Sequence, residues 1–244
     1  MLELLTDPAV WASFVTLTVL EIVLGVDNVI FISIAAQRLP PEQRGTARIA
    51  GLSGALVLRI GLLFSISWII SLAEPFLTVA GFGLSWRDVI LFAGGLFLIW
   101  KASTEIFDEV EGTEESVAGA VAKSLMAVIA QIMVLDLVFS LDSVITAVGI
   151  ADHLEVMIAA VVLSVMVMMA AAEPIGRFVE QHPSTKMLAL AFLVMVGMAL
   201  VADGAHFHIE RGFIYAAMLF SGAVEGLNLM RSKRRRKAAR PENS

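Results

Sequence analysis

Two ten-residue stretches of this sequence resemble each other: residues 21–30 read EIVLGVDNVI, and residues 136–145 read DLVFSLDSVI. Each stretch begins with an acid, has a small residue four positions later and a second acid two positions after that, and ends in Val-Ile. An amide follows the second acid in the first stretch, and a hydroxyl follows it in the second. Both stretches lie within long apolar segments, so the chain contains an internal repeat built around acids in apolar surroundings.

The composition explains what those surroundings are. Of the 244 residues, 58% are hydrophobic and only 16% are charged, and the mean hydropathy is +0.85. A soluble domain usually has about 25% charged residues, so this chain cannot cover its surface with water-facing groups. Cysteine is absent, which excludes disulfides, thiolate nucleophiles and zinc fingers. The composition indicates an integral membrane protein and excludes a cytosolic enzyme, a nucleic-acid binder and a disordered linker protein.

Seven apolar segments are long enough to cross a bilayer, which takes about 20 residues each. We therefore predict an all-α polytopic membrane protein in which residues 1–230 form a single transmembrane domain. The predicted spans are residues 9–36, 46–73, 88–104, 123–150, 154–176, 186–204 and 212–230.

The basic residues predict how these spans are oriented. All of them except Arg87, Arg211 and the intramembrane Arg59 fall on the side reached by the odd-numbered connections and by the C-terminal tail. Positive charge accumulates on the cytoplasmic side of membrane proteins. We therefore expect the N-terminus outside, the C-terminus in the cytoplasm, and residues 231–244 as a basic cytoplasmic tail against anionic lipid.

The two acidic motifs predict how the spans are grouped. The first repeat covers about residues 9–104 and the second about 123–204, with the seventh helix, about 212–230, added at the end. Because each repeat has three spans, the second repeat crosses the membrane in the opposite sense to the first. Many secondary transporters build a midplane site from such inverted repeats.

Acidic residues within membrane spans are costly in free energy, and their presence predicts a cation-binding site. An ionised carboxylate at the bilayer centre costs several kcal/mol unless it is paired, hydrated or bound to a cation. The candidate ligands are all oxygen donors, which suit Mg²⁺, Ca²⁺ or Mn²⁺ better than Zn²⁺ or Cu²⁺. They are Glu21, Asp27, Asn28, Asp136, Asp142 and Ser143.

A regular helix would not bring both acids of one motif together, because residues six positions apart lie about 120° apart around the axis. We therefore expect both helices to unwind or bulge near Gly25 and Ser140, which would turn Asp27 and Asp142 inward. Arg59, in the middle of the second span, is expected to face one of the acids. It would either help metal release or form a purely structural ion pair.

Three lesser features have more than one interpretation. Ala73-Glu74-Pro75 and Ala172-Glu173-Pro174 form a weaker echo of the repeat. The acids of residues 105–115 could gather cations or simply belong to a solvated connection with a short polar helix. His206 and His208 could capture a divalent ion or be bystanders in a loop.

Three functional classes compete on these grounds. A transporter of a hard divalent cation fits the four acids, and protons are the expected coupling ion because carboxylates that release a metal can be protonated. A membrane scaffold whose acids hold helices together is the alternative. An intramembrane aspartyl hydrolase is disfavoured, because the Tyr-Asp and Gly-x-Gly-Asp contexts expected there are missing. No phosphate-binding loop is present, so ATP hydrolysis by this chain is not expected.

The motifs also resemble a known family. EIVLGVDNVIF (21–31) and QIMVLDLVFSLDSVITAVG (131–149) look like the hallmark motifs of the TerC family of bacterial integral membrane proteins. GLFLIWKASTEI (95–106) and IERGFIYAAMLFS (209–221) are similar to it as well. No regulatory CBS domain follows the last span, so the chain resembles the short, membrane-only branch.

The resemblance implies a seven-helix fold related to the LysE transporter superfamily, located in the bacterial cytoplasmic membrane, and manganese export. It assigns metal ligation to the same six residues. It implies no enzymatic activity and no resident cofactor, with Mn²⁺ as a transported substrate, and it raises a second copy of the chain or the secretion machinery as partners. The family's name derives from tellurite resistance, but buried acids make a poor site for an oxyanion.

Overall fold

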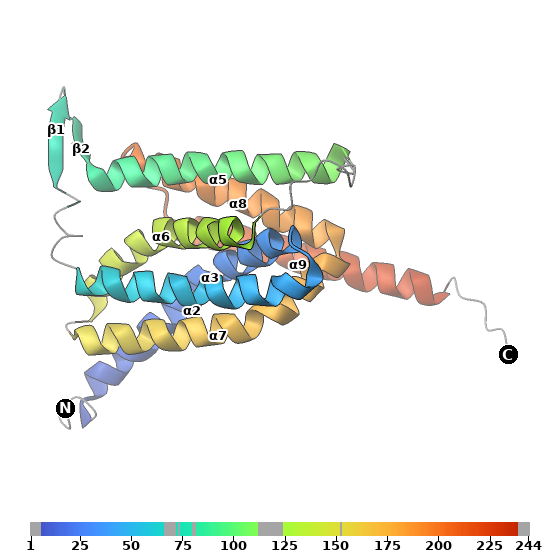
Figure 1. The fold of residues 1–244 in the computed structure, drawn as a ribbon, viewed down its shortest axis with the longest axis horizontal. Coiled ribbons are helices and arrows are strands. Elements are labelled where there is room, and N and C mark those ends of the chain that lie inside the picture. The colour runs from blue at the N-terminus through green and yellow to red at the C-terminus, as the bar shows by residue number, and fades with distance from the viewer. Residues whose placement is uncertain are drawn as a thin grey trace.

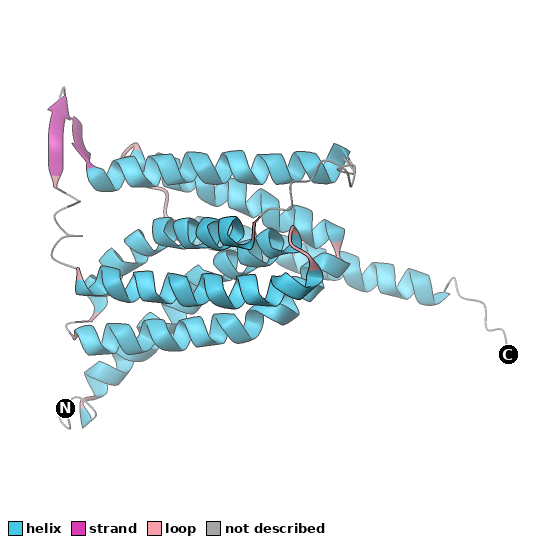
Figure 2. Cartoon of the chain, viewed as in Figure 1, coloured by secondary structure: helices cyan, strands magenta, loops and turns pink. Residues whose placement is uncertain are grey.

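The computed structural model describes residues 6–65, 72, 74–79, 82–111, 124–151 and 153–238 of the chain. Within these residues the structure is a helical bundle with a short antiparallel hairpin at one end (Figures 1 and 2). The long helices are α2 (Pro8–Gln37), α3 (Pro41–Phe64), α5 (Trp86–Glu111), α6 (Leu125–Ile150), α7 (Leu154–Gln181), α8 (Pro183–Gly204) and α9 (Arg211–Ala238). The hairpin consists of β1 (Pro75–Val79) and β2 (Phe82–Ser85).

Most of these helices are long and apolar enough to cross a bilayer. In the part of the chain that is described, six helices meet this condition, and α6 adds a shorter apolar stretch, Leu125–Leu141. The protein is therefore a polytopic α-helical membrane protein, and this part of the predicted fold class is confirmed. The predicted spans lie on these helices, except for the end of the second span, which falls on residues 66–71 and 73, outside the described residues.

Proline and a capping acid set several helix starts. Pro8, Pro41 and Pro183 each stand in the first turn of a helix, where the missing N–H is not needed for helical hydrogen bonding. Asp7 precedes α2, and its carboxylate accepts a hydrogen bond from the Ala9 backbone N–H at 2.8 Å. The start of α2 agrees closely with the predicted span 9–36, whereas α3 and α8 begin before the predicted starts at 46 and 186, because their first turns are polar.

The helix α5 is longer than the predicted span 88–104. It continues to Glu111, because most of the residues after 104 are good helix formers. The predicted span ended earlier because the mean hydropathy of the segment falls before the helix ends. Lys101 Nζ lies 2.7 Å from Glu105 Oε1 one turn later, and both side chains are buried. The expected short polar helix after residue 104 is therefore present up to Glu111 as a continuation of α5, although Glu105 is buried and not solvated, and residues 112–123 lie outside the described part.

The weaker sequence match around Pro75 and Pro174 does not correspond to a shared secondary structure. Pro75 begins the strand β1, whereas Pro174 lies inside the continuous helix α7. The hairpin itself was not predicted. It is held by strand pairing and by Phe76, which stacks on Trp86 with ring centroids 4.9 Å apart.

The helices pack in pairs that cross between the two halves of the chain: α5 packs most closely on α8, α2 on α7 and α3 on α6. Glycines allow the first of these contacts. A Cβ atom on Gly95 would lie 2.6 Å from the carbonyl oxygen of Gly197, and one on Gly197 would lie 2.9 Å from the carbonyl oxygen of Gly95. Two backbones therefore touch at a point that no larger residue could occupy.

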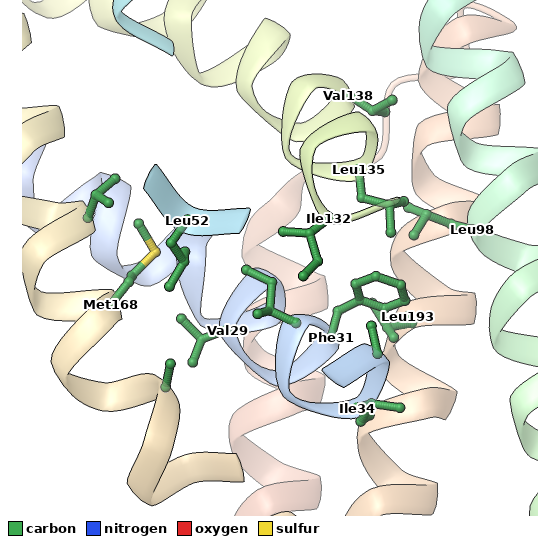
Figure 3. Close-up of a cluster of buried hydrophobic side chains, with 14 of the residues drawn as sticks. Val29, Phe31, Ile34, Leu52, Leu98, Ile132, Leu135, Val138, Met168 and Leu193 are labelled. Carbon is green, nitrogen blue, oxygen red and sulfur yellow. The ribbon is translucent and has the colours of Figure 1, made fainter. Parts of the chain in front are cut away.

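Apolar side chains from six helices fill the interior (Figure 3). The labelled members are Val29, Phe31 and Ile34 of α2, Leu52 of α3, Leu98 of α5, Ile132, Leu135 and Val138 of α6, Met168 of α7 and Leu193 of α8. The helix α9 contributes little, since its apolar stretch is almost entirely exposed within the single chain. It extends beyond the other helices at the end where α2 finishes and α3 begins (Figure 1).

Ion pairs join the helices at that same end. Arg38, directly after α2, binds Glu105 and Asp108 of α5, and Lys186 of α8 binds Glu109 of α5 at 2.5 Å. Burial by itself lowers the pKa of Arg38, but the hydrogen bonds and charges of the two acids outweigh burial and raise it. The positive charge is therefore retained, and it ties α2 to α5.

Candidate ion-binding site

A buried ion cluster joins three helices. Arg59 of α3 lies between Glu21 of α2 and Asp136 of α6, and all three residues are at least 97% buried. Arg59 Nε donates to Asp136 Oδ2 at 2.9 Å, and Nη2 donates to Oδ1 at 2.7 Å. Arg59 Nη1 donates to Glu21 Oε2. The cluster thus contains two acids from the two repeat motifs and a single arginine from a third helix.

Asp136 is surrounded by further donors. Asn28 Nδ2 donates to Asp136 Oδ1 at 3.1 Å, and Ser140 Oγ lies 3.0 Å from Asp136 Oδ2. Ser143 Oγ, also buried, donates to the Ser140 carbonyl oxygen at 3.3 Å. The carboxylate of Asp136 thus contacts side chains from all three helices of the cluster.

The predicted helix breaks are absent. The helix α2 runs unbroken through Gly25, and α6 runs unbroken through Ser140. The small residues serve other purposes: a Cβ on Gly25 would lie 2.3 Å from Met168 Sδ of α7, and Ser140 Oγ donates to the Asp136 carbonyl oxygen at 2.5 Å. Close helix packing requires a small residue at position 25, and the hydrogen bond to the preceding turn is made by the short side chain of Ser140. Neither contact requires the helix to unwind.

The structure therefore brings together three of the six predicted ligand residues, Glu21, Asn28 and Asp136, through hydrogen bonds in the cluster. Ser143 is buried one turn beyond Ser140 and bonds to the carbonyl oxygen of Ser140. The backbones of Asp27 and Asp142 lie in α2 and α6, but their side chains are outside what the structure describes. Among the described residues, no three of His, Asp and Glu are grouped closely enough to hold a metal ion. Metal ligation thus stays a prediction.

The two outer histidines do not form a shared site. His206 Nε2 lies 2.9 Å from Asp88 Oδ2, whereas His208 Nδ1 lies 3.1 Å from Asp203 Oδ1. Asp88 also accepts hydrogen bonds from the backbone and the side chain of Ser85 at the start of α5. Each histidine thus has its own aspartate, which favours the structural interpretation over ion capture.

Sequence reasoning missed the second buried charge cluster, formed by Arg38, Lys101 and Glu105. Its signal was available: Lys101 and Glu105 are four residues apart, which places them on one helix face. It was overlooked because the acids after residue 104 were grouped with the connection that follows. The partner Arg38 could not be inferred from spacing, since it lies 67 positions away.

With this geometry established, comparison with known proteins identifies the family. Residues 6–240 match the family described as Integral membrane protein TerC family. The chain belongs to the TerC family. Within it, the chain is 55% identical to the UPF0053 inner membrane protein YgdQ of Escherichia coli strain K12, over 94% of this chain and 97% of YgdQ. A UPF0053 protein of Haemophilus influenzae is 53% identical over the same shares of the two chains.

Some TerC-family relatives are longer. The UPF0053 inner membrane protein YoaE of E. coli K12 is 51% identical over 93% of this chain but only 44% of YoaE. No solved structure matches the chain. The family match, the relatives described as inner membrane proteins and the membrane-spanning helices together establish a multi-pass protein of the bacterial cytoplasmic membrane.

Proposed function

We propose that this TerC-family protein exports a hard divalent cation, with Mn²⁺ as the leading candidate, in exchange for protons that enter the cell. The ion would bind at the cluster of Glu21, Asn28 and Asp136, together with Asp27 and Asp142 from the same two helices. The observation that carries the proposal is that two buried acids from different helices meet at one arginine.

The charge balance of the cluster supports an ion-binding role. Glu21 and Asp136 carry two negative charges when ionised, and Arg59 supplies one positive charge. Uncompensated charge within a membrane is costly and usually marks an ion or proton pathway. In this proposal Arg59 occupies the site between transport events, and a divalent cation replaces it by neutralising both carboxylates. Protonation of the two carboxylates then releases the ion, which makes the exchange close to electroneutral.

The helix packing supports the proposed inverted repeat. In an inverted repeat, α2 corresponds to α6, α3 to α7 and α5 to α8. The contact between α2 and α7 then corresponds to the contact between α6 and α3, and the contact between α5 and α8 corresponds to itself. The three most extensive helix contacts between the two halves are thus preserved when the halves are exchanged. Such a pseudo-twofold relationship is what alternating access to a central site requires.

The distribution of charge supports the proposed orientation. Arg38, Arg44 and Lys186 lie at the end of the bundle where α3 and α8 begin, and the basic residues 231 and 233–237 lie in the last turns of α9, which extends from that end (Figure 1). By the positive-inside rule, this end faces the cytoplasm. A site midway between the two ends would then take its ion from the cytoplasm and release it outside.

A membrane scaffold remains the second candidate, and one observation favours it. Asp136 accepts hydrogen bonds from Arg59, Asn28 and Ser140, so its charge is already well satisfied without a metal. In this alternative the cluster only specifies how α2, α3 and α6 pack.

Flux measurements distinguish the two candidates. Purified protein is reconstituted into liposomes that contain a Mn²⁺-sensitive dye, and Mn²⁺ entry is recorded with and without a pH gradient. We expect gradient-dependent flux, at least a tenfold loss in Glu21→Gln and in Asp136→Asn, and a similar loss in Asp27→Asn and Asp142→Asn. Glu155→Gln is the matched control, because Glu155 is an exposed acid in the first turn of α7.

The outcome that would reject transport is equally clear. If folded wild-type protein moves none of Mn²⁺, Mg²⁺ and Ca²⁺, and the cluster variants differ from it only in thermal stability, the acids are structural. Flux of Mg²⁺ or Ca²⁺ without Mn²⁺ would retain the transporter but change its substrate.

A further inference from the structure

The helices α3 and α7 line a half-open cavity of about 510 Å³ at the end of the bundle where α3 begins and α7 finishes. It is distinct from the buried ion cluster, since Glu21, Arg59 and Asp136 are not among the residues that line it. Its charged lining residues are Glu42, Arg44, Arg48, Glu173, Arg177 and Glu180. The rest of the described lining is largely apolar, which makes the cavity amphipathic.

Charge and apolarity are ordered along the two helices. On α3, Glu42 and Arg44 lie in the first turn and Arg48 follows, whereas the apolar Ile49 and Leu52 lie farther from the helix start. A helix rises about 1.5 Å per residue, so Arg48 is about 10 Å from the start of α3. On α3, the wall of the cavity thus changes from charged to apolar about 10 Å from the helix start.

The helix α7 repeats this order in the opposite chain direction. Glu180 and Arg177 lie nearest its C-terminal end, Glu173 follows, and Ala172 and Met169 are deepest. Both walls of the cavity thus change from charged to apolar in the same direction. A ligand that fits this gradient has a polar head and an apolar body.

Among the arginines that line the cavity, Arg48 is the one left for a ligand. Arg44 Nη1 binds Glu180 Oε1 at 2.7 Å, and Arg177 pairs with Glu173 on its own helix. Arg48 is 92% buried, and its Nε has no hydrogen-bond partner among the described residues. Glu173, the carboxylate with the largest electrostatic effect on Arg48, is engaged by Arg177.

A buried guanidinium without a hydrogen-bond partner is costly, and it is stabilised by an anion that accepts two N–H bonds at once. Phosphate matches this geometry. We infer that the cavity binds a membrane phospholipid, with its phosphate on Arg48 and an acyl chain along Ile49, Leu52 and Met169. The bilayer supplies ligands of this amphipathic kind, and basic side chains in pockets between helices bind lipid headgroups.

Lipid titration followed by native mass spectrometry tests the inference. Delipidated full-length protein in detergent is titrated with dioleoylphosphatidylglycerol and dioleoylphosphatidylethanolamine, with dioleoylglycerol, which lacks the phosphate, and with sodium phosphate. We expect one copy of either phospholipid to bind at least tenfold more tightly than further copies. We expect no such copy of dioleoylglycerol and no competition from millimolar inorganic phosphate.

Two variants make the test specific to the cavity. Arg48→Gln removes the charge and should abolish the tight copy. Gly45→Trp fills the cavity instead and leaves Arg48 in place. Gly45 lines the cavity, and a Cβ atom added to it would have no other atom within 4 Å, so the helix tolerates a side chain there. The matched control is Gly61→Trp, on the same helix, outside the cavity lining and equally unobstructed.

Three results would overturn the inference. The first is tight phospholipid binding in Arg48→Gln and Gly45→Trp that equals binding in the wild type. The second is equal binding of dioleoylglycerol, which would show that the phosphate is not recognised. The third is displacement of the lipid by inorganic phosphate, which would indicate a site for free anions.

Discussion

Arg59 binds Asp136 through two nitrogen atoms, with Nε 2.9 Å from Oδ2 and Nη2 2.7 Å from Oδ1, although the two residues are 77 positions apart in the chain. The same guanidinium reaches Glu21 with its remaining nitrogen. One side chain of α3 thus joins the two repeat motifs. In the proposed transporter, this arginine holds the empty site together and competes with the metal ion.

The first prediction concerns Arg59→Gln. Removing the arginine leaves Glu21 and Asp136 buried without a counter-charge, so we expect the free energy of unfolding to fall by about 3–5 kcal/mol. If the acids bind metal, millimolar Mn²⁺ should restore part of this loss, because a ligand that binds only the folded state stabilises it. Thermal unfolding in detergent, with Mn²⁺ and with a chelator, measures both effects.

The double variant Arg59→Gln/Asp136→Asn is the control for this measurement. It removes one acid together with the arginine, so it should be more stable than Arg59→Gln and should gain less from Mn²⁺. Wild-type stability in Arg59→Gln would contradict the ion pairing seen here, and a missing Mn²⁺ effect would count against metal binding.

The second prediction concerns the contact between α5 and α8. In Gly95→Ala, the new methyl group would lie 2.6 Å from the Gly197 carbonyl oxygen and 2.8 Å from the Val201 nitrogen. Both are backbone atoms that cannot rotate away, so we expect a loss of about 1–3 kcal/mol in the free energy of unfolding. Gly61→Ala is the control: nothing lies within 4 Å of its Cβ position, and alanine should stabilise that helix by up to about 1 kcal/mol. Equal melting temperatures for the two variants would show that the helices do not touch here.

The third prediction compares two acids at the basic end of the bundle. Glu105 is 7% exposed and contacts Arg38 and Lys101, whereas the Glu180 side chain is 47% exposed and contacts Arg44. Glu105→Ala leaves two basic groups without their buried partner and should cost about 3–5 kcal/mol. Glu180→Ala should cost less than about 1 kcal/mol, because water screens an exposed pair. Chemical or thermal denaturation of both variants measures the two losses in the free energy of unfolding. A larger loss for Glu180→Ala than for Glu105→Ala would contradict the burial of Glu105.

The fourth prediction tests the orientation in the membrane. The chain has no cysteine, so single cysteines can be introduced without background. Thr78, in the hairpin, and Gln43, at the start of α3, are both exposed and lie at opposite ends of the bundle. We expect a maleimide that cannot cross the cytoplasmic membrane to label Thr78→Cys in intact cells and Gln43→Cys only after lysis. The reverse pattern would invert the proposed direction of transport.

The sequence predicted the features of this protein that depend on local composition. Hydropathy located the membrane-spanning helices, because a segment of about 20 apolar residues is stable in a bilayer only as a helix. The two acidic motifs pointed to Glu21 and Asp136, and these two acids do lie in one cluster. The energetic cost of placing charge in lipid makes such residues conspicuous in any sequence.

The helix breaks at Gly25 and Ser140 were wrongly predicted for a related reason. A small residue next to an acid is compatible with an unwound helix and equally compatible with tight packing against a neighbour. The choice depends on what faces the residue, which is Met168 of α7 for Gly25. Sequence spacing alone contains no information on that neighbour.

By itself, then, the sequence determined the approximate position of the apolar helices, the motifs that contain the acids, and the family. Tertiary structure decided that Arg59 meets Glu21 and Asp136 at once, that Arg38 pairs with Glu105, and that Arg48 lines a cavity with its Nε unpartnered among the described residues. Hydropathy and helix formation are properties of short segments, so they can be read along the chain. Ion pairing across helices depends on how each helix is rotated and which neighbour it packs against, and only the folded bundle sets those relationships.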